Sequence, residues 1–315
     1  MLSVWARAPL RISFAGGGTD TDAFLKQTDT AGMVVSAAIS RYVYARATLG
    51  GQGLVFYPLD EQAGYLERLI NPYPPALVEV RVDMPPRSGL GTSGALGVAV
   101  LGCLESLHYG HGPGGHLIKL AKIAHEVECL EASAGWQDHV SAAFGGLRAI
   151  TFVPEIHARP VKAHPGTLLA LESSLILAFI HPRAGSSYRI MAAETGRVKM
   201  GDAVTMSYLI RQRDLAQQVA QALEAGNLVT FGELLDEAWQ VKKGQSPEAT
   251  NEVIDAVYEI AKKAGALGGK CCGAGGGGFM VFFAPEKEGP VSEALRAIGL
   301  RPENVTFDWQ GLQVW

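Results

Sequence analysis

The chain has 315 residues, of which 48% are hydrophobic and 18% charged, and its formal net charge at neutral pH is −4. This length suggests about two domains, and the composition excludes a disordered chain. A slight acidic excess without a dense run of Lys or Arg argues against a protein that binds nucleic acid. We find no apolar stretch long enough for a bilayer and no apolar signal core at the start, so we expect a cytoplasmic protein without a membrane partner.

The four cysteines show neither a CxxC pair nor zinc spacing, which indicates reduced structural thiols. The 38 glycines are more distinctive, because they gather in clusters that follow no fixed period. The clusters lie at 16–18, 89–97, 110–115, 145–146 and 265–278. Glycine clusters at the ends of apolar segments are typical of backbone loops that approach a ligand closely.

Hydrophobic periodicity predicts a mixture of strands and helices in the first half of the chain. The expected elements are strands at 4–14, 34–49, 53–57, 77–83 and 147–153, helices at 93–108 and 116–131, and a loop with a short helix at 135–146. The helix at 93–108 is apolar nearly all round, which predicts a buried central helix.

The second half opens with a stretch rich in Pro and His at 154–166. The expected elements after it are strands at 175–180 and 279–284, helices at 186–198, 202–224, 228–240, 249–264 and 288–298, and a closing strand or hairpin in VTFDWQGLQVW. This pattern predicts an α+β protein with a domain boundary near 150–165.

The segment PPRSGLGTSGALG (Pro85–Gly97) follows a predicted strand and opens a predicted helix. Backbone N–H groups at a helix N-terminus form an anion site that the helix dipole reinforces, and glycines let phosphate oxygens come close. Thr92 and Ser93 place hydroxyl groups where a phosphate or its metal ion would lie. A tight strand-to-helix turn without a ligand is the alternative interpretation.

The same loop matches GxGxxG at Gly89, Gly91 and Gly94, and the tract 273–278 matches it as well. A dinucleotide-binding fold would need an acidic residue about 20 positions further on, and residues 109–118 contain none. The GxxxxGK[ST] pattern and the protein-kinase HRD and DFG motifs are also absent. We therefore expect a phosphate loop of another kind.

Three motifs, in order along the chain, resemble those of the GHMP small-molecule kinases, the family of galactokinase, homoserine kinase, mevalonate kinase and phosphomevalonate kinase. APLRISFAGGGTD (8–20) resembles their first motif, and KCCGAGGGGF (270–279) resembles their third, glycine-rich motif. PPRSGLGTSGA resembles their ATP-phosphate motif P-x-x-x-G-L-G-S-S-A-A, with Thr92 and Gly94 in place of a Ser and an Ala.

The resemblance implies an α+β, two-domain GHMP kinase fold that uses ATP and Mg²⁺. The N-terminal ATP-binding domain (1–155) would be ribosomal-protein-S5-like, and the C-terminal domain (156–315) ferredoxin-like. The active site would lie in the cleft between them, with the third motif packed beside the phosphate loop.

Within the family, RISFAGGGTD, GWQDHVSAAFGG and GALGGKCCGAGGGGF are most similar to the kinases of D-glycero-D-manno-heptose 7-phosphate. This likeness implies phosphoryl transfer from ATP to the anomeric hydroxyl of a sugar phosphate, giving a 1,7-bisphosphate. The alternatives are a fucose- or galactose-like 1-kinase, a sensor that binds sugar and ATP without catalysis, and an ATP-dependent decarboxylase of the same fold. The sequence leaves a monomer and a homodimer equally open.

The resemblance assigns the chemistry to Asp138 as the catalytic carboxylate and to Arg11 as a cation that stabilises transferring charge. Without the resemblance, Asp138 could be a helix N-cap and Arg11 a surface ion-pair residue. The ATP-binding residues would be Pro85, Ser88, Gly89, Leu90, Gly91, Thr92, Ser93 and Gly94, and the structural glycine loop would comprise Gly273, Gly275, Gly276 and Gly277.

Magnesium requires hard oxygen ligands, which Ser93 and a glutamate would supply. Glu126 and Glu128 compete for this role, and the helical period places Glu128 inside the apolar stripe and Glu126 opposite it. A carboxylate that faces inward needs a partner, so we expect Glu128 to bind the metal. The longer motif spacing of galactokinase would select Glu126 instead.

Substrate-binding candidates lie in the first motif and in the C-terminal half. The first motif offers Gly17, Gly18, Thr19 and Asp20, with Asp22 as a weaker candidate, because Asp carboxylates accept hydrogen bonds from sugar hydroxyls. For a sugar phosphate, the C-terminal candidates are Arg183, Ser186, Ser187 and Arg189 and the pair Lys242 and Lys243. Trp136 is a further candidate for the sugar site, whereas His139 is expected to be structural.

Overall fold

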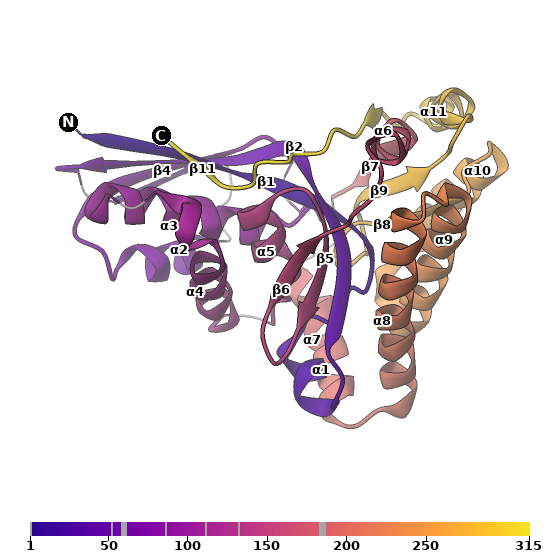
Figure 1. Cartoon of the computed structure of the whole chain (residues 1–315), viewed down its shortest axis with the longest axis horizontal. Coiled ribbons are helices and arrows are strands. Elements are labelled where there is room, and N and C mark those ends of the chain that lie inside the picture. The colour runs from indigo at the N-terminus through magenta and orange to yellow at the C-terminus, as the bar shows by residue number, and fades with distance from the viewer. Residues whose placement is uncertain are drawn as a thin grey trace.

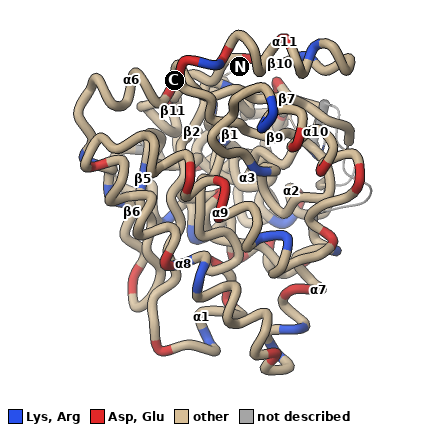
Figure 2. Tube along the Cα trace, turned by 90° about the vertical axis from the view of Figure 1, so that its right-hand side faces the viewer, with Lys and Arg blue, Asp and Glu red and all other residues tan. Residues whose placement is uncertain are grey.

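A computed structural model describes residues 2–51, 53–57, 62–85, 87–110, 112–131, 133–182 and 187–315. Two sheets carry the architecture, and the helices that pack on them divide into two groups (Figure 1). The two ends of the chain lie near each other at one end of the first sheet (Figure 1). In the view of Figure 2, acidic and basic residues are interspersed along the described chain rather than gathered in one region.

The first sheet is built on two long antiparallel strands, β1 (Ser3–Ala15) and β2 (Gly32–Leu49). One half of β2 pairs with β4 (Ala76–Val82), and the other half pairs with β5 (Leu147–Phe152). The remaining members are β3 (Gly53–Tyr57), parallel to β4, β6 (His157–Pro160), and the two-residue β11 (Gln313–Val314), which pairs with β1.

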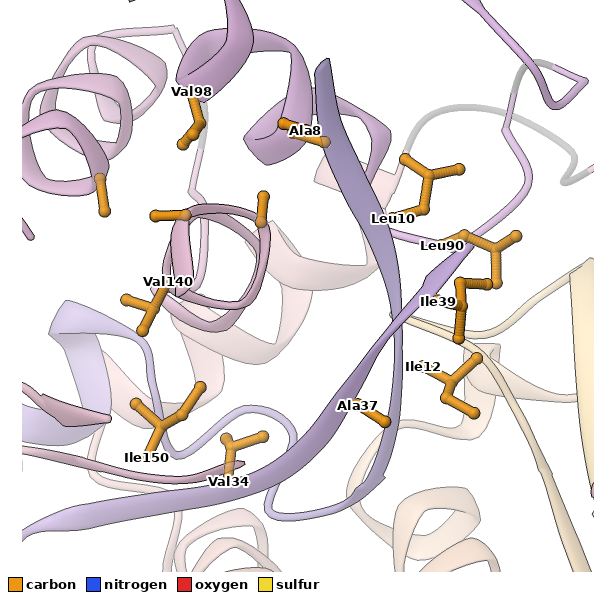
Figure 3. Close-up of a cluster of buried hydrophobic side chains, with 14 of the residues drawn as sticks. Ala8, Leu10, Ile12, Val34, Ala37, Ile39, Leu90, Val98, Val140 and Ile150 are labelled. Atoms are coloured by element: carbon orange, nitrogen blue, oxygen red, sulfur yellow. The ribbon is translucent and has the colours of Figure 1, made fainter. Parts of the chain in front are cut away.

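Helix α3 (Thr92–Tyr109) packs against β1 and β2 and is buried along most of its length, as its sequence predicts. Helices α2 (Ala63–Ile70), α4 (Leu117–Cys129) and α5 (Gln137–Phe144) pack against α3, whereas α1 (Asp22–Gln27) lies apart from it, against α7 (Ser187–Lys199). In Figure 3, Val140 of α5 points toward Val34 and Ile150 of the sheet, and all three side chains are fully buried. Burial of this apolar layer fixes α5, and with it Asp138, against the sheet.

The second sheet has the order β10-β7-β9-β8 and is antiparallel throughout. Its strands are β7 (Leu175–His181), β8 (Gly268–Cys271), β9 (Gly278–Phe283) and β10 (Pro302–Asn304). Its helices are α6 (Pro165–Ser173), α7 (Ser187–Lys199), α8 (Ala203–Glu224), α9 (Leu228–Gln245), α10 (Glu252–Lys263) and α11 (Glu288–Ala297).

Side-chain caps fix where three of these helices begin. Asp202, Asn227 and Asn251 accept hydrogen bonds from the backbone N–H groups of Thr205, Thr230 and Ile254, respectively. Each bond satisfies an N–H group that has no partner within its own helix. The predicted helices at 202–224, 228–240 and 249–264 begin within three residues of α8, α9 and α10, and α9 continues to Gln245, five residues beyond its predicted end.

The two sheets share a hydrophobic core. Phe231 of α9 contacts Phe14 of β1 and Phe283 of β9, with ring centroids 5.1 and 5.0 Å apart and both pairs edge-on. Edge-on aromatic pairs add to the stabilisation that burial provides. The two halves are therefore held together beneath the cleft that separates their loops.

Most predicted elements are confirmed, and the differences concern short ones. The sequence missed α1, α2, α6, β6, β8 and β10. The closing segment, predicted as a strand or hairpin, contributes the short strand β11, whose Gln313–Val314 pair with β1. The return of β11 to the first sheet means that the C-terminal residues belong structurally with the N-terminal half. The boundary at 155/156 stays a prediction. Within the described residues, no helix combines the length and the apolar character needed to cross a membrane.

Candidate active site

A cleft of about 1200 Å³, counted out to its open mouth, lies between the loops of the two halves. Its described lining comes from the first glycine motif, the loop before α3, the start of α5, helix α4 and the C-terminal helices α7 and α9. Small molecules commonly bind in concave sites where a few polar groups converge, so this cleft is the candidate site.

Arg11 and Asp138, which both line this cleft, form an ion pair. Nε and Nη2 of Arg11 lie 2.8 and 2.6 Å from Oδ1 of Asp138, and Nη1 donates to the carbonyl of Gly89 at 2.7 Å. The guanidinium is buried, whereas the carboxylate is 23% exposed to the cleft. A planar guanidinium with several donors suits this task, because it holds the carboxylate and the phosphate loop at once.

The loop between β4 and α3 has the geometry of an anion site. Gly89 and Gly91 adopt φ values of +81° and +80°, which favour glycine, and α3 begins at Thr92. Ser88, Gly89, Gly91, Thr92 and Ser93 line the cleft beside the N-terminus of this long helix. Its free N–H groups and its dipole both favour a phosphate here.

Three predicted ATP-binding residues lie outside the lining of the cleft. Pro85 is exposed. Leu90 is buried, and the carbonyl of Leu90 accepts a hydrogen bond from the backbone N–H of Arg11. Gly94 packs against α5: a Cβ there would lie 2.6 Å from the Cβ of Asp138. These residues shape the loop, and Gly94 lets Asp138 approach α3.

The third glycine motif packs against the phosphate loop, as the resemblance implies. The N–H of Phe279 donates to the carbonyl of Ser88 at 2.8 Å, and a Cβ on Gly273 would lie 2.8 Å from the carbonyl oxygen of Gly89. Gly273 lines the cleft, whereas a Cβ on Gly275 would meet the backbone of Ala249, 2.5 Å away. Gly276 and Gly277 adopt φ values of +72° and +139° and do not line it.

Glu128 is buried in the wall of the cleft, and Glu126 is exposed, as the helical period predicts. The hydroxyl of Tyr188 donates to Oε1 of Glu128 at 3.0 Å, and Nε2 of His139 lies 2.9 Å from Oε2, outside hydrogen-bond angles. Burial opposes ionisation, yet the contacts with His139, Ser93 and Tyr188 hold the pKa of Glu128 below its usual value.

An ionised, inward-facing carboxylate beside the Ser93 hydroxyl is a donor set that fits Mg²⁺. The described residues hold no cluster of three or more His, Cys, Asp or Glu side chains for a metal ion. Magnesium is usually held by one or two carboxylates together with substrate phosphates, so Ser93 and Glu128 are the residues that would hold it here.

The first motif places Gly17, Gly18 and Asp20 in the cleft. Asp20 is buried and accepts hydrogen bonds from the backbone N–H groups of Gly18 at 3.2 Å and Gln137 at 3.0 Å. Burial, with a smaller contribution from the nearby Asp138, raises the pKa of Asp20 above its usual value.

Thr19 of this motif and the more distant Trp136 have structural roles rather than the expected substrate contact. Thr19 is fully buried outside the cleft, with Oγ1 2.8 Å from the carbonyl of Gly16 and 3.0 Å from that of Met33, so it closes the loop. Trp136 also lies outside the cleft lining, stacked on His125 at 3.6 Å with Nε1 donating to Asp22.

The C-terminal candidates divide. Lys242 is buried, lines the cleft and pairs with Glu194 at 3.0 Å, whereas Lys243 turns to Asp255 at 3.5 Å and does not line the cleft. Arg189 is exposed on α7 outside the lining. Arg183 and Ser186 lie outside the described residues, and Ser187 begins α7 but its side chain is not described.

Sequence reasoning missed several residues that line the cleft: Gln62, Arg87, Gln137, Tyr188, Ile190, Met191 and Glu194. Most of them lie outside the three motifs, so no local pattern marked them. Tyr188, Met191 and Glu194 follow one another at three-residue spacing on α7, so that successive members are neighbours along one side of the helix. This spacing could have indicated that α7 contributes to the site. Such a pattern more often indicates a helix face that packs against a core.

Comparison with known proteins agrees with this geometry. The model described as the GHMP kinases N terminal domain matches residues 58–146, and the one described as GHMP kinases C terminal matches 219–301. Together they cover more than half of the chain. The D-glycero-alpha-D-manno-heptose 7-phosphate kinase of Campylobacter jejuni is 26% identical, in an alignment spanning 100% of this chain and 99% of that protein.

Two other relatives widen this picture. A solved D-glycero-D-manno-heptose 1-phosphate kinase from Bacteroides thetaiotaomicron superposes with a TM-score of 0.75 at 25% identity, covering 99% of this chain and 98% of that one. A bifunctional fucokinase/GDP-fucose pyrophosphorylase of Arabidopsis thaliana is 26% identical over 67% of this chain but only 20% of its own length. The similarity thus reaches several kinases that differ in the sugar they are named for.

Proposed function

This chain belongs to the GHMP kinase family, and we propose that it transfers the γ-phosphoryl group of ATP to the anomeric hydroxyl of a sugar. The preferred acceptor is D-glycero-D-manno-heptose 7-phosphate, and the product is the 1,7-bisphosphate. The observation that carries the proposal is the Arg11–Asp138 pair, which lies in the cleft beside the N-terminus of α3.

The arrangement supports a transfer in which the residues position the reactants and offset charge. The N-terminus of α3 and the glycine loop hold the phosphate chain. Asp138 orients the acceptor hydroxyl and receives its proton as the hydroxyl oxygen bonds to the γ-phosphorus. The bond from that phosphorus to the bridging oxygen breaks, and ADP leaves.

Arg11 serves this step in two ways. It fixes Asp138 through two donors and reaches the carbonyl of Gly89 in the phosphate loop with a third. Its positive charge therefore lies between the proton acceptor and the phosphate site, where negative charge spreads during transfer. Ser93 and Glu128 would hold Mg²⁺, which offsets charge on the phosphates when bound.

The heptose phosphate is preferred because the C. jejuni relative, which aligns over the whole chain, is named for it. The Bacteroides relative is named for a heptose 1-phosphate, and the Arabidopsis relative for fucose, a sugar without phosphate. A fucose- or galactose-like 1-kinase is therefore the second candidate. It is favoured by the ion pairs of Arg11 with Asp138 and of Lys242 with Glu194, which engage two of the cations that line the cleft.

The test is ADP release with Mg²⁺ and ATP in the presence of D-glycero-D-manno-heptose 7-phosphate, free mannose, galactose or fucose. We expect turnover with the heptose phosphate at least tenfold above each free sugar in kcat/KM, about 1.4 kcal/mol of discrimination. Turnover of a free sugar alone would retain the kinase and discard the heptose phosphate. Folded protein that binds ATP but releases no ADP with any sugar would overturn the proposal.

A further inference from the structure

We propose that Glu194 binds hydroxyl groups of the acceptor sugar and forms, together with Asp20, a polyol-binding wall of the cleft. The inference rests on the proposed function, because it concerns the acceptor that the kinase uses. Glu194 lies on α7, far along the chain from the three motifs that identify the family. It lines the cleft with only 6% of its surface exposed.

The hydrogen bonds that Glu194 accepts all go to one of its two carboxylate oxygens. Its Oε2 accepts from Nζ of Lys242 at 3.0 Å, from Nε2 of Gln245 at 2.8 Å and from Oγ of Ser246 at 2.7 Å. No residue of the described chain donates to Oε1. A carboxylate has about four acceptor positions, so this side chain is held rigidly by one oxygen and keeps its other oxygen for a ligand in the cleft.

The free oxygen of Glu194 lies next to Gly18, where Asp20 also converges. A Cβ on Gly18 would lie 2.5 Å from Oε1 of Glu194, and the N–H of Gly18 donates to Oδ1 of Asp20 at 3.2 Å. Gln245 joins the two elements, since Nε2 also donates to the carbonyl of Gly17 at 3.3 Å. The absence of a side chain at Gly18 thus keeps two buried carboxylates open to one small volume.

The charges of this wall select the kind of ligand that fits it. Glu194 and Asp20 are acceptors, and the nearby cation Lys242 is already paired with Glu194. Neutral hydroxyl donors satisfy such carboxylates, whereas a phosphate would meet like charge in a buried setting. The inference therefore also orients the acceptor: its hydroxyls face Glu194 and Asp20, and any phosphate that it carries points away from this wall.

The test compares wild type with Glu194→Gln by calorimetric titration of the four sugars in the presence of ADP and Mg²⁺. We expect the Kd of the bound sugar to rise at least tenfold while the Kd of ADP changes less than twofold. The matched control is Glu233→Gln, an exposed glutamate of α9 that should change neither. Because Glu194→Gln leaves Lys242 unpaired, the double variant Glu194→Gln/Lys242→Met, which removes both charges, repeats the test and should show the same loss.

Monodeoxy analogues of the bound sugar separate direct contact from a structural role. Wild type should bind the analogue that lacks the contacted hydroxyl more weakly than it binds the parent sugar. Glu194→Gln should bind the analogue and the parent sugar with equal affinity. Equal sugar affinity in wild type and both variants would overturn the inference, as would a wild type that binds ADP and none of the four sugars. A sugar that binds through Glu194 without being phosphorylated would support the inference and overturn the proposed function.

Discussion

The guanidinium of Arg11 contacts Asp138 through one carboxylate oxygen, Oδ1, and leaves the other, Oδ2, free of its own donors. Nε and Nη2 both lie on Oδ1, at 2.8 and 2.6 Å, and no residue of the described chain donates to Oδ2. The carboxylate is thereby fixed in place and still exposed to the cleft. This is the arrangement that a residue needs if it is to accept the proton of a bound hydroxyl.

Replacement of Asp138 by Asn should remove proton acceptance while keeping the contact with Arg11. We expect kcat to fall by about 10²–10⁴-fold, the usual contribution of a general base, with ATP affinity nearly unchanged. Steady-state ADP release and nucleotide titration measure the two quantities. Asp22→Asn is the control, because Asp22 bonds Lys26 and Trp136 outside the cleft, and its kcat should stay within a few-fold of wild type.

Replacement of Glu128 by Gln should weaken magnesium binding, because a neutral amide is a poorer ligand for a hard cation. The Mg²⁺ concentration for half-maximal ADP release should rise about tenfold or more, a change read from a magnesium titration at saturating ATP. Glu126→Gln, two residues away and exposed, should leave the titration curve unchanged. If the two variants behave alike, or if Glu126→Gln is the more affected, the assignment to Glu128 is wrong.

A side chain at position 273 should displace the loop before α3, which the third glycine motif contacts at Gly89. Gly273 adopts φ +66°, and a Cβ there would lie 2.8 Å from the backbone carbonyl of Gly89. Gly273→Ala should therefore raise the KM for ATP roughly tenfold, because the strain of about 1–2 kcal/mol is relieved by shifting one of the two loops. Gly289→Ala has open space around it and should keep the wild-type KM; an unaffected KM in Gly273→Ala would contradict the packing argument.

Lys270 should make stability depend on pH on the alkaline side. Its Nζ is buried and donates to the carbonyl of Ser13 at 2.8 Å, and burial lowers its pKa to about 8 from 10.5. Between pH 8 and pH 10.5 the unfolded chain binds a proton that the folded chain has lost. The free energy of unfolding therefore rises with pH in this range. Below pH 8 both states bind the proton and the dependence disappears.

Urea unfolding of wild type and Lys270→Met at pH 7.5, 8.5 and 9.5 measures this contribution. The unfolding free energy of wild type, relative to the variant, should increase by about 1–2 kcal/mol between pH 7.5 and pH 9.5. A difference that stays constant across this range, or that falls, would show that Lys270 does not titrate there.

The sequence predicted the parts of the site that local chemistry defines. The glycine loop before α3 has the expected geometry, and the helical period correctly separated buried Glu128 from exposed Glu126. These features depend on short-range spacing and on the turn conformations that glycine allows. The resemblance added Asp138 and Arg11, whose pairing across the chain the structure then shows.

The sequence could not predict contacts that depend on the meeting of distant segments. Glu194 and Lys242 are 48 positions apart, and nothing in either helix indicates that they pair in the wall of the cleft. Thr19 shows the converse: its motif position suggested a ligand, but its hydroxyl is engaged by backbone carbonyls of the loop. Short elements such as β8 and α1 were missed because they are fixed by pairing and packing with distant segments rather than by periodicity.

The measurement that tests the central claim most directly is phosphorus NMR of the reaction of ATP, Mg²⁺ and D-glycero-D-manno-heptose 7-phosphate with the protein. We predict a new resonance whose phosphorus couples to the anomeric proton, appearing in step with ADP and absent with Asp138→Asn. A phosphoryl group attached at another carbon, or ATP consumed only to inorganic phosphate, would contradict transfer to the anomeric hydroxyl.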